Sequence, residues 1–266
     1  MIETVEIGII EAIVRAAATL MDRTGGFDVQ EKGARENIVT SSDLAVQHFL
    51  TRELKERFPE IGFLCEEEDM NDIQGHEAVW VIDPIDGTCN YSRGNENCCI
   101  SVALVEHGEA VLGVVYSPWR GELYTALKGK GALCNGKPIH VSDRPYEKGL
   151  LFTAMALYKK DLAKACSDII YDLYMECNDV RRTGSAAVEL CLMAAGFAEL
   201  YFEMRLMPWD YAAAGLILQE AGGTVCSFDG GAPSPYKPSM YIAANNKENC
   251  ERILAVVRKY LSDLPF

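Results

Sequence analysis

Apolar residues recur at helical spacing in two segments near the start of the chain. In residues 5–22 the apolar positions are Ile9, Ile10, Ile13, Val14, Ala17 and Leu20. This period places them on one face, so we predict an amphipathic helix that ends at Gly25-Gly26. A second helix is predicted over residues 44–58. The polar residues 27–35 between them predict a hairpin or loop around Lys32-Gly33.

Two short apolar runs lead directly into acidic residues. Residues 61–65 precede Glu66-Glu67-Glu68-Asp69, and residues 79–82 precede Asp83. Their content is typical of buried strands, and Pro84 predicts that the ladder of the second strand ends there, because proline lacks an N–H. If the two strands are neighbours in one sheet, Glu66, Asp83 and Asp86 converge and offer the oxygen ligands that Mg²⁺ prefers. The alternative is that the acidic run is only a solvated loop.

Asp86-Gly87-Thr88 follows the second strand and combines a turn residue, a glycine and a hydroxyl that can cap a helix. Such a turn can direct backbone N–H groups at an anion. Asp-Pro and Asp-Gly are also common dipeptides of structural turns. The segment by itself therefore leaves a phosphate-binding role and a purely structural role open.

Asp43 and Asp210 each allow two interpretations as well. Ser41, Ser42 and Asp43 can all cap the helix of residues 44–58. Asp210 lies in the first turn of another predicted helix, where a carboxylate interacts favourably with the helix dipole. Both acids thus have a structural explanation beside the functional one.

The remaining pattern divides the chain into two halves. Residues 99–105, 110–116, 122–126 and 132–141 have the pattern of antiparallel strands. Polar residues around 143–149, with Pro145, predict a boundary between an N-terminal α+β half (residues 1–145), which carries most metal ligands, and a C-terminal α/β half (residues 146–266).

The C-terminal half alternates predicted helices with predicted strands, which is typical of α/β construction. The helices are predicted over residues 159–177, 185–195, 209–221 and 247–261, and the extended segments over residues 180–182, 198–203, 224–228 and 240–244.

Composition narrows the class of protein. The chain has 266 residues and a formal net charge of -14, which argues against nucleic acid and anionic membrane as partners, because proteins that neutralise phosphates display clustered Lys and Arg. Ten cysteines without a Cys-x-x-Cys pair indicate reduced thiols. The first residues lack a basic signal region and no apolar run reaches membrane-spanning length, so we expect a cytoplasmic protein.

Three motifs together resemble the inositol monophosphatase family of the lithium-sensitive, Mg²⁺-dependent phosphatase superfamily. They are Asp83-Pro84-Ile85-Asp86-Gly87-Thr88, the upstream Glu66-Glu67, and the downstream Trp209-Asp210-Tyr211-Ala212-Ala213 with Gly222-Gly223. The resemblance covers nearly the whole chain. It implies a layered αβαβα sandwich of the inositol monophosphatase and fructose-1,6-bisphosphatase type, with the active site between the halves and a homodimer as the assembly.

The resemblance also implies a set of metal ligands. Glu66, Asp83 and the Ile85 carbonyl correspond to ligands of a first Mg²⁺, and Asp83, Asp86 and Asp210 to ligands of a second. Glu67 corresponds to an acid that supports the outer shell or a weaker third ion. Two ions about 3.5–4 Å apart can stabilise both the attacking and the leaving oxygen of an in-line displacement. Li⁺ and Ca²⁺ are the expected inhibitors.

Catalytic and substrate-binding residues follow from the same correspondence. Glu66 with the Asp43–Thr88 pair is expected to activate the attacking water. The expected substrate contacts are Asp86, Gly87, Thr88, Gly184, Ser185, Ala186 and Glu203. A carboxylate such as Glu203 is a good acceptor for the vicinal hydroxyl groups of inositol.

Several positions depart from the family pattern. Cys65 and Cys89 stand where Gly and Thr are common, and a catalytic cysteine is the alternative that they raise, although no His lies nearby in the sequence to activate either. Asn95-Glu96-Asn97 replaces an aromatic-Pro-aromatic segment, and Arg205 adds a cation near Glu203. The last two changes bear on substrate specificity.

These features predict a Mg²⁺-dependent phosphomonoesterase that hydrolyses inositol monophosphate or a similar polyol or sugar phosphate. Histidinol phosphate, fructose 1,6-bisphosphate and 3′-phosphoadenosine 5′-phosphate are the alternative substrates. A different alternative is a non-catalytic binding or regulatory protein on the same fold.

Overall fold

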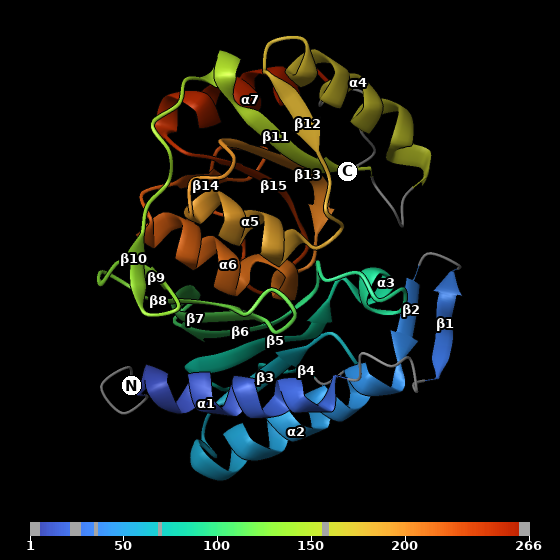
Figure 1. Cartoon of the computed structure of the whole chain (residues 1–266), viewed down its shortest axis with the longest axis vertical. Coiled ribbons are helices and arrows are strands. Elements are labelled where there is room, and N and C mark those ends of the chain that lie inside the picture. Colours follow the sequence, from blue (N-terminus) through green and yellow to red (C-terminus); the bar gives the residue numbers. More distant parts are fainter. Residues whose placement is uncertain (1–5, 22–27, 35–36, 69–70, 156–159, 261–266) are drawn as a thin grey trace.

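The chain forms five layers in the order helices, sheet, helices, sheet, helices (Figure 1). The computed structural model describes residues 6–21, 28–34, 37–68, 71–155 and 160–260. This architecture confirms the predicted αβαβα sandwich. The exact boundary between an N-terminal and a C-terminal half stays a prediction.

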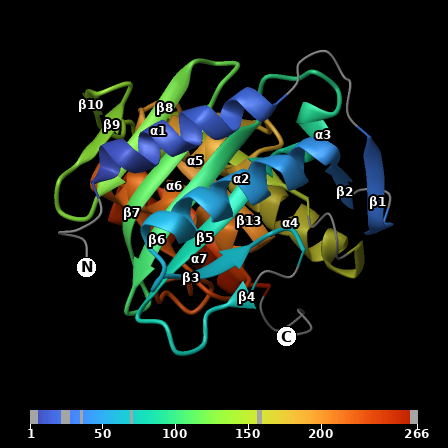
Figure 2. The same ribbon diagram turned by 90° about the horizontal axis from the view of Figure 1, so that it is seen from below.

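Two helices form the first layer. They are α1 (Ile7–Ala17), which continues into the short 3-10 helix Ala18–Leu20, and α2 (Ser41–Arg57). Figure 2 shows both lying across one face of the larger sheet. A cluster that includes Ile10, Val14, Leu50 and Trp80 fills the space between these helices and that sheet.

A hairpin joins the two helices, as the sequence predicted, and Lys32-Gly33 lie in its first strand. Strand β1 (Val29–Ala34) pairs antiparallel with β2 (Asn37–Thr40), so Lys32-Gly33 belong to a strand and not to the turn. Gly25-Gly26, predicted to end the first helix, lie outside the described residues.

The second layer is a sheet of eight strands in the order β10-β9-β8-β7-β6-β5-β3-β4. Their bounds are β3 (Gly62–Cys65), β4 (Asn71–Asp72), β5 (Ala78–Asp86), β6 (Cys99–Glu106), β7 (Glu109–Ser117), β8 (Glu122–Leu127), β9 (Ala132–Cys134) and β10 (Lys137–Ile139). Strand β3 lies parallel to β5, with Cys65 opposite Ile82. The two strands that precede the acidic residues are therefore neighbours, as predicted.

Strand β5 does not end before Pro84. It continues to Asp86, and its pairing with β6 passes from Asp83 opposite Ser101 to Asp86 opposite Cys99 through a shift of register. Pro84 lies in this irregular stretch, where a missing N–H does not interrupt a regular ladder. The prediction that the strand stops at Pro84 was wrong.

The fourth layer is a sheet of five strands in the order β12-β11-β13-β15-β14. Their bounds are β11 (Leu150–Ala154), β12 (Asp179–Arg181), β13 (Leu200–Leu206), β14 (Thr224–Cys226) and β15 (Ser239–Ala244). The sequence interpretation missed β11. Its apolar residues follow directly on the polar boundary segment, and parallel pairing with β12 and β13 makes it a strand.

Helices cover both faces of this smaller sheet. Helices α4 (Ala163–Tyr174) and α7 (Lys247–Arg258) form the outer layer, and α5 (Ala186–Ala194) and α6 (Pro208–Glu220) lie between the two sheets (Figure 1). Helix α4 is preceded by the 3-10 helix Lys160–Leu162. A 3-10 helix also spans Tyr146–Lys148.

Helix ends differ by a few residues from prediction. The predicted helix of residues 5–22 is α-helical only to Ala17, and the C-terminal helix ends at Arg258. Lys159 and Leu261, the predicted outer ends of two helices, lie outside the described residues. Within the described part of the chain, no helix is both long and apolar enough to cross a membrane.

Candidate metal-dependent active site

Three carboxylates from two layers meet at one point. Asp83 and Asp86 come from β5 and Asp210 from the first turn of α6, and each offers an oxygen within 4.8 Å of those of the other two. None of the three forms an ion pair with a Lys, Arg or His that the structure describes. Asp83 is only 1% exposed.

Burial and mutual repulsion raise the pKa of all three acids. The pKa of Asp83 lies well above its ordinary value because the side chain is desolvated and faces Glu66, Asp86 and Asp210. Burial also raises the pKa of Asp86 to about 6. The pKa of Asp210 is raised by burial and by the charges of Asp86 and Glu66. Acids so placed ionise readily only beside added positive charge, and carboxylate oxygens suit Mg²⁺. The donor set therefore fits a divalent cation.

Asp86 is held by the N-terminal end of α5. Its Oδ2 accepts hydrogen bonds from Ser185 Oγ at 2.6 Å and from the backbone N–H of Ala187 at 2.7 Å. The Ser185 hydroxyl, expected to contact substrate, thus donates to a candidate metal ligand. Ala186 is the first residue of α5, beside these two donors.

Backbone N–H groups orient the other two acids. Asp83 Oδ1 accepts from the N–H of Ile85 at 3.0 Å, across the irregular end of β5. Asp210 Oδ2 accepts from the N–H of Met207 at 2.7 Å, which fixes the carboxylate at the start of α6. In both cases the second carboxylate oxygen has no hydrogen bond to a described residue, which leaves it for a ligand.

Thr88 connects this cluster to Asp43. The Thr88 Oγ1 lies 3.0 Å from Asp43 Oδ1 and 3.0 Å from the Ile85 carbonyl oxygen, so its proton has two acceptors. Asp43 is fixed in turn because its Oδ2 accepts from the backbone N–H of Thr40 at 2.8 Å and from the Thr40 hydroxyl. Asp43 therefore serves both the helix start and Thr88.

The structure corrects two expectations about helix caps in this region. Thr40 is the N-cap residue of α2, whereas Ser41, Ser42 and Asp43 already belong to the helix. Asp43 still takes part in the cap, because its side chain accepts from the Thr40 N–H in a capping box. The Thr88 hydroxyl does not cap the short helix α3 (Thr88–Tyr91), because it bonds to Asp43 and Ile85 instead.

Gly87 makes the turn before α3 possible. Its φ of +90° lies in the left-handed region, and a Cβ there would meet the Asn97 carbonyl oxygen at 2.9 Å. Asn97 is brought close by Asn90, whose Nδ2 donates to the carbonyls of Asn97 at 2.7 Å and Thr183 at 2.8 Å. The Asn95-Glu96-Asn97 segment thus packs against the central turn through polar contacts.

Glu66 and Glu67 follow β3 at the same edge of the sheet. Glu66 is part-exposed and lies outside the group of three converging acids, and of the neighbouring charges it raises the pKa of Asp83 the most. Glu67 is buried, and Gln47 of α2 holds its backbone through hydrogen bonds of 2.7 and 3.0 Å. Gln47 was not among the predicted residues, since a glutamine on a helix gives no sign of a distant partner.

The buried Glu189 and the half-buried Glu203 form a second pair of acids beside the cluster. Burial, together with the charge of Glu189, raises the pKa of Glu203 to about 8, and its carboxylate accepts from the Tyr201 hydroxyl at 2.8 Å. Burial raises the pKa of Glu189 to about 7, and its Oε1 accepts from the N–H groups of Thr183 and Gly184. Arg205, also on β13, is exposed.

Sequence reasoning missed Glu189 and Tyr201. Glu189 is the only charged residue in α5, which is otherwise apolar and wholly buried, and that contrast is a signal that could have identified it. Tyr201 gives no such signal, because its position within a buried strand is explained by packing alone.

Neither candidate cysteine has the surroundings of a nucleophile. Burial raises the pKa of Cys65 to about 12, which keeps the thiol protonated near neutral pH. Cys89 is exposed on α3, and its sulfur accepts a hydrogen bond from Arg93 at 2.7 Å, with no described His or carboxylate bonded to it. The site is built from carboxylates and not from thiols.

Comparison with known proteins agrees with this geometry. Residues 1–262 match the model of the inositol monophosphatase family. The chain is 41% identical over 199 residues to the Nus factor SuhB of Xylella fastidiosa, covering 74% of this chain and 71% of that protein.

Two solved structures have the same fold. The Thermotoga maritima IMPase superimposes with a TM-score of 0.83 at 31% identity and covers 97% of each chain. A structure described as an IMPase/NADP phosphatase complexed with Mg²⁺ and phosphate superimposes with a TM-score of 0.82 at 26% identity, covering 93% of this chain and 92% of that one. The chain belongs to the inositol monophosphatase family.

Proposed function

We propose that the protein is a Mg²⁺-dependent phosphomonoesterase that hydrolyses inositol monophosphate or a similar polyol or sugar phosphate. The observation that carries this proposal is the convergence of Asp83, Asp86 and Asp210 within 4.8 Å. Asp83 and Asp86 are buried and Asp210 is half-buried, and none of the three forms an ion pair with a described cationic side chain. Membership of the family gives the reaction class. Divalent cations are needed because the three converging carboxylates repel one another when they are ionised.

Two or three Mg²⁺ ions are assigned to these residues. Glu66, Asp83 and the Ile85 carbonyl would hold the first ion, Asp83, Asp86 and Asp210 the second, and Glu67 would support a weaker third. Bound Mg²⁺ supplies positive charge that lowers the pKa of a water and stabilises the departing oxygen. The part-exposed position of Glu66 next to the buried Asp83 supports a site open to water on that side.

Thr88 and Asp43 position the attacking water and receive its proton. The Thr88 hydroxyl donates to Asp43 Oδ1 at 3.0 Å, which leaves its lone pairs free to accept from a water. As that water loses its proton, the hydroxyl can pass its own proton to Asp43. The contacts of Thr40 with Asp43 keep this acceptor in place.

The substrate lies between the central turn and β13. The backbone of Gly87 and Thr88 binds the phosphate, close to Asp86. Gly184, Ser185 and Ala186 form the wall opposite, and Glu203 accepts hydrogen bonds from hydroxyl groups of the polyol. The surroundings of Glu203 raise its pKa and so disfavour its ionised form, and hydroxyl groups that donate hydrogen bonds to the carboxylate would stabilise that form.

The test is phosphate release with and without Mg²⁺ from four substrates, namely inositol monophosphate, histidinol phosphate, fructose 1,6-bisphosphate and 3′-phosphoadenosine 5′-phosphate. We expect inositol monophosphate to be the best substrate. Asp210→Asn should lower kcat by about 10²-fold or more, because a lost ligand removes several kcal/mol of charge stabilisation. Absence of release from all four substrates, or an equally active Asn variant, refutes the assignment.

Li⁺ and Ca²⁺ are proposed as inhibitors that compete for these carboxylates. The same assay with millimolar LiCl measures this, and undiminished activity would remove the chain from the lithium-sensitive group. A cytoplasmic location and a homodimer also stay predictions.

A second candidate function is a factor role without turnover. It is favoured by the name of the relative that is 41% identical, Nus factor SuhB. The expectation of no nucleic-acid partner rests on the net charge of -14 alone and is open to test under this candidate. Wild-type protein that releases no phosphate yet binds RNA in a gel-shift assay would favour the factor role.

A further inference from the structure

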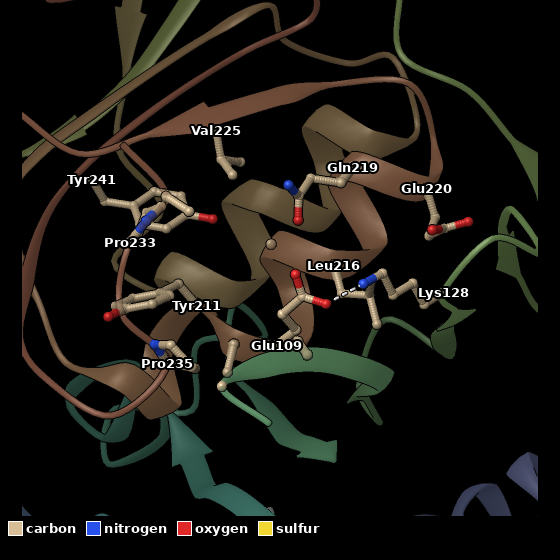
Figure 3. A pocket seen from close by; sticks show the side chains of 15 residues that line it. Glu109, Lys128, Tyr211, Leu216, Gln219, Glu220, Val225, Pro233, Pro235 and Tyr241 are labelled. Atoms are coloured by element: carbon tan, nitrogen blue, oxygen red, sulfur yellow. Dashed lines mark hydrogen bonds and ion pairs between the residues drawn. The ribbon is translucent and has the colours of Figure 1, made fainter. Parts of the chain in front are cut away.

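A cleft of about 270 Å³ lies along α6, away from the carboxylates at its N-terminal end. Figure 3 shows it between α6, the start of β7 and the loop of residues 232–235. Apolar groups of Leu216, Val225, Pro233 and Pro235 line it, with the rings of Tyr211 and Tyr241. None of the proposed metal ligands is among its lining residues.

Tyr211 fixes the outer wall of this cleft. Its hydroxyl lies 2.5 Å from the Ser234 carbonyl oxygen and 2.8 Å from that of Lys237. These contacts hold the loop that carries Pro233 and Pro235 against α6. The cleft is thus a preformed feature of the fold.

Tyr241 presents an unpaired hydroxyl to the cleft. The residue is 1% exposed, and its hydroxyl makes no hydrogen bond with any residue in the described part of the chain. Its ring packs on Tyr211, with centroids 4.8 Å apart, and edge-on to Tyr201. Figure 3 shows the hydroxyl directed toward the interior of the cleft.

Gly215 of α6 makes room for this hydroxyl. A Cβ at Gly215 would lie 2.3 Å from the Tyr241 oxygen. Because the Tyr241 hydroxyl forms no hydrogen bond with a described residue, it can bond to a ligand in the cleft without losing a contact within the protein. The fold therefore places an unpaired hydroxyl beside the apolar part of the cleft lining.

Charges at the rim select against anions. Lys128 is already paired with Glu109. Glu220 accepts from the N–H groups of Gly129 at 2.7 Å and Gly131 at 2.8 Å, and its charge is not balanced by a second cation among the lining residues. A phosphate ester of the kind proposed for the active site would meet net negative charge here.

We propose that this cleft is a second ligand site, which takes a small, flat aromatic molecule that is neutral or cationic. The ring of the ligand packs against Tyr211, Pro233 and Pro235, and a polar atom of the ligand hydrogen-bonds to the Tyr241 hydroxyl. Aromatic and proline surfaces favour such a ring. The site is independent of the proposed phosphatase function.

The test uses three probes that share one ring and differ in charge, namely tryptamine, indole and indole-3-acetate. Binding to the full chain is measured by NMR titration. We expect tryptamine and indole to bind, and indole-3-acetate to bind about tenfold more weakly than tryptamine because of the rim charge. Failure of tryptamine and indole to bind, or tightest binding of the anion, overturns the proposal.

Three variants locate the binding. Tyr241→Phe should weaken indole binding about fivefold without lowering the melting temperature, because the hydroxyl has no partner in the described protein. Ala232→Trp, at an exposed lining position, should block the cleft, and Asp210→Asn should leave binding unchanged. Unchanged binding in both cleft variants, or its loss in Asp210→Asn, places the probe elsewhere and overturns the proposal.

Discussion

Thr88 shows how much of the candidate chemistry depends on a single hydroxyl. Its Oγ1 lies 3.0 Å from Asp43 Oδ1, while the residue is also at the start of α3 next to the central turn. The sequence indicates a hydroxyl at this turn. The family resemblance implied the pairing of Thr88 with Asp43, and the structure has this contact. Only the fold shows that the hydroxyl does not cap its own helix.

We predict that Thr88→Val lowers kcat for phosphate release by about 10²–10⁴-fold, because valine keeps the shape but cannot relay a proton. Thr88→Ser is the matched control and should keep most of the activity. Mg²⁺ binding, measured as a thermal shift, should persist in both variants. Comparable activity of the Val and wild-type proteins would contradict the role of Thr88.

Glu203 gives a prediction about pH. The pKa of this half-buried acid is raised to about 8, by desolvation first and then by the charge of Glu189, whereas it is about 4.5 in a solvated side chain. Between these values the folded protein keeps the proton that the unfolded chain has lost, so the free energy of unfolding falls as pH rises through this window. Asp86, Arg182 and Tyr201 also act on Glu203.

Glu203→Gln removes this titration. In the presence of EDTA, the melting temperature of the variant should therefore fall less between pH 5 and pH 8 than the melting temperature of the wild type. In a chain of this size, each kcal/mol of unfolding free energy corresponds to about 2–4 °C in melting temperature. Glu56→Gln, at an exposed position of α2, serves as the control. Parallel melting curves for wild type and Glu203→Gln across this range would show that Glu203 does not titrate as argued.

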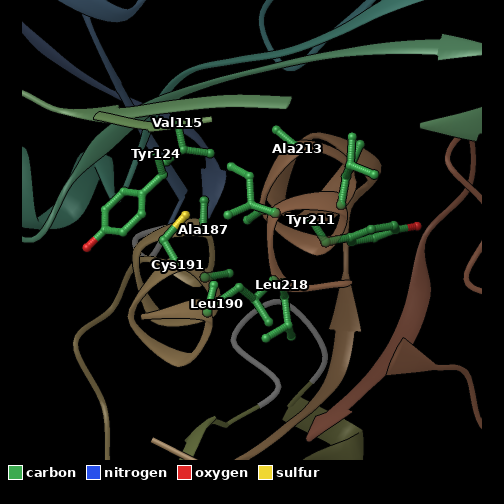
Figure 4. Packing of buried hydrophobic residues seen from close by; sticks show 14 of the residues in the cluster. Val115, Tyr124, Ala187, Leu190, Cys191, Tyr211, Ala213 and Leu218 are labelled. Atoms are coloured by element: carbon green, nitrogen blue, oxygen red, sulfur yellow. The ribbon is translucent and has the colours of Figure 1, made fainter. Parts of the chain in front are cut away.

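At the level of elements, the central helices decide how closely the two sheets approach. Figure 4 shows Ala213 and Leu218 of α6, Ala187, Leu190 and Cys191 of α5, and Val115 and Tyr124 of the larger sheet in one buried cluster. Small residues on α6 let its backbone approach β7. At Gly113 the approach is so close that a Cβ would lie 2.7 Å from the Ala213 carbonyl oxygen.

Gly113→Ala should therefore destabilise the protein by about 1–3 kcal/mol. The new methyl group would push the backbone of β7 away from that of α6, the helix that carries Asp210. Gly8→Ala, on the exposed side of α1 where a Cβ meets nothing within 4 Å, should be neutral or stabilising. Urea unfolding of both variants measures the difference. A Gly113→Ala protein as stable as Gly8→Ala would mean that the β7–α6 contact is looser than described.

On the scale of the whole molecule, the candidate site is complete only when three elements from two adjacent layers are in place. β5 brings Asp83 and Asp86, α6 brings Asp210, and α5 fixes Asp86. Bringing these charges together without a cation opposes folding, as their raised pKa values indicate. Cations that bind here should stabilise the complete fold.

We predict that Mg²⁺ at 100 times its dissociation constant raises the free energy of unfolding by about 2.7 kcal/mol relative to EDTA. Differential scanning calorimetry measures the shift. Asp83→Asn should abolish it, because Asp83 belongs to both proposed ion sites. A shift of equal size in this variant would place the stabilising ions elsewhere in the molecule.

The sequence determined most of the element order and the acidic ends of two neighbouring strands. Periodicity predicted the main helices, and the motifs around Glu66, Asp83 and Asp210 indicated the family before any contact was known. These features are local, because a helix face or a strand end is written in residues that are close in the chain. Strand β11 escaped this reasoning, since a short apolar run becomes a strand only through its pairing partners.

Tertiary structure alone decided which side chains act on one another. It brought Ser185 to Asp86 and Glu189 to Glu203, and it left the Tyr241 hydroxyl unpaired beside a cleft. It also carried β5 past Pro84, because a shift of register absorbed the missing N–H. Burial, pKa and hydrogen-bond partners depend on segments that are far apart in the chain, and their packing is fixed only when all five layers assemble.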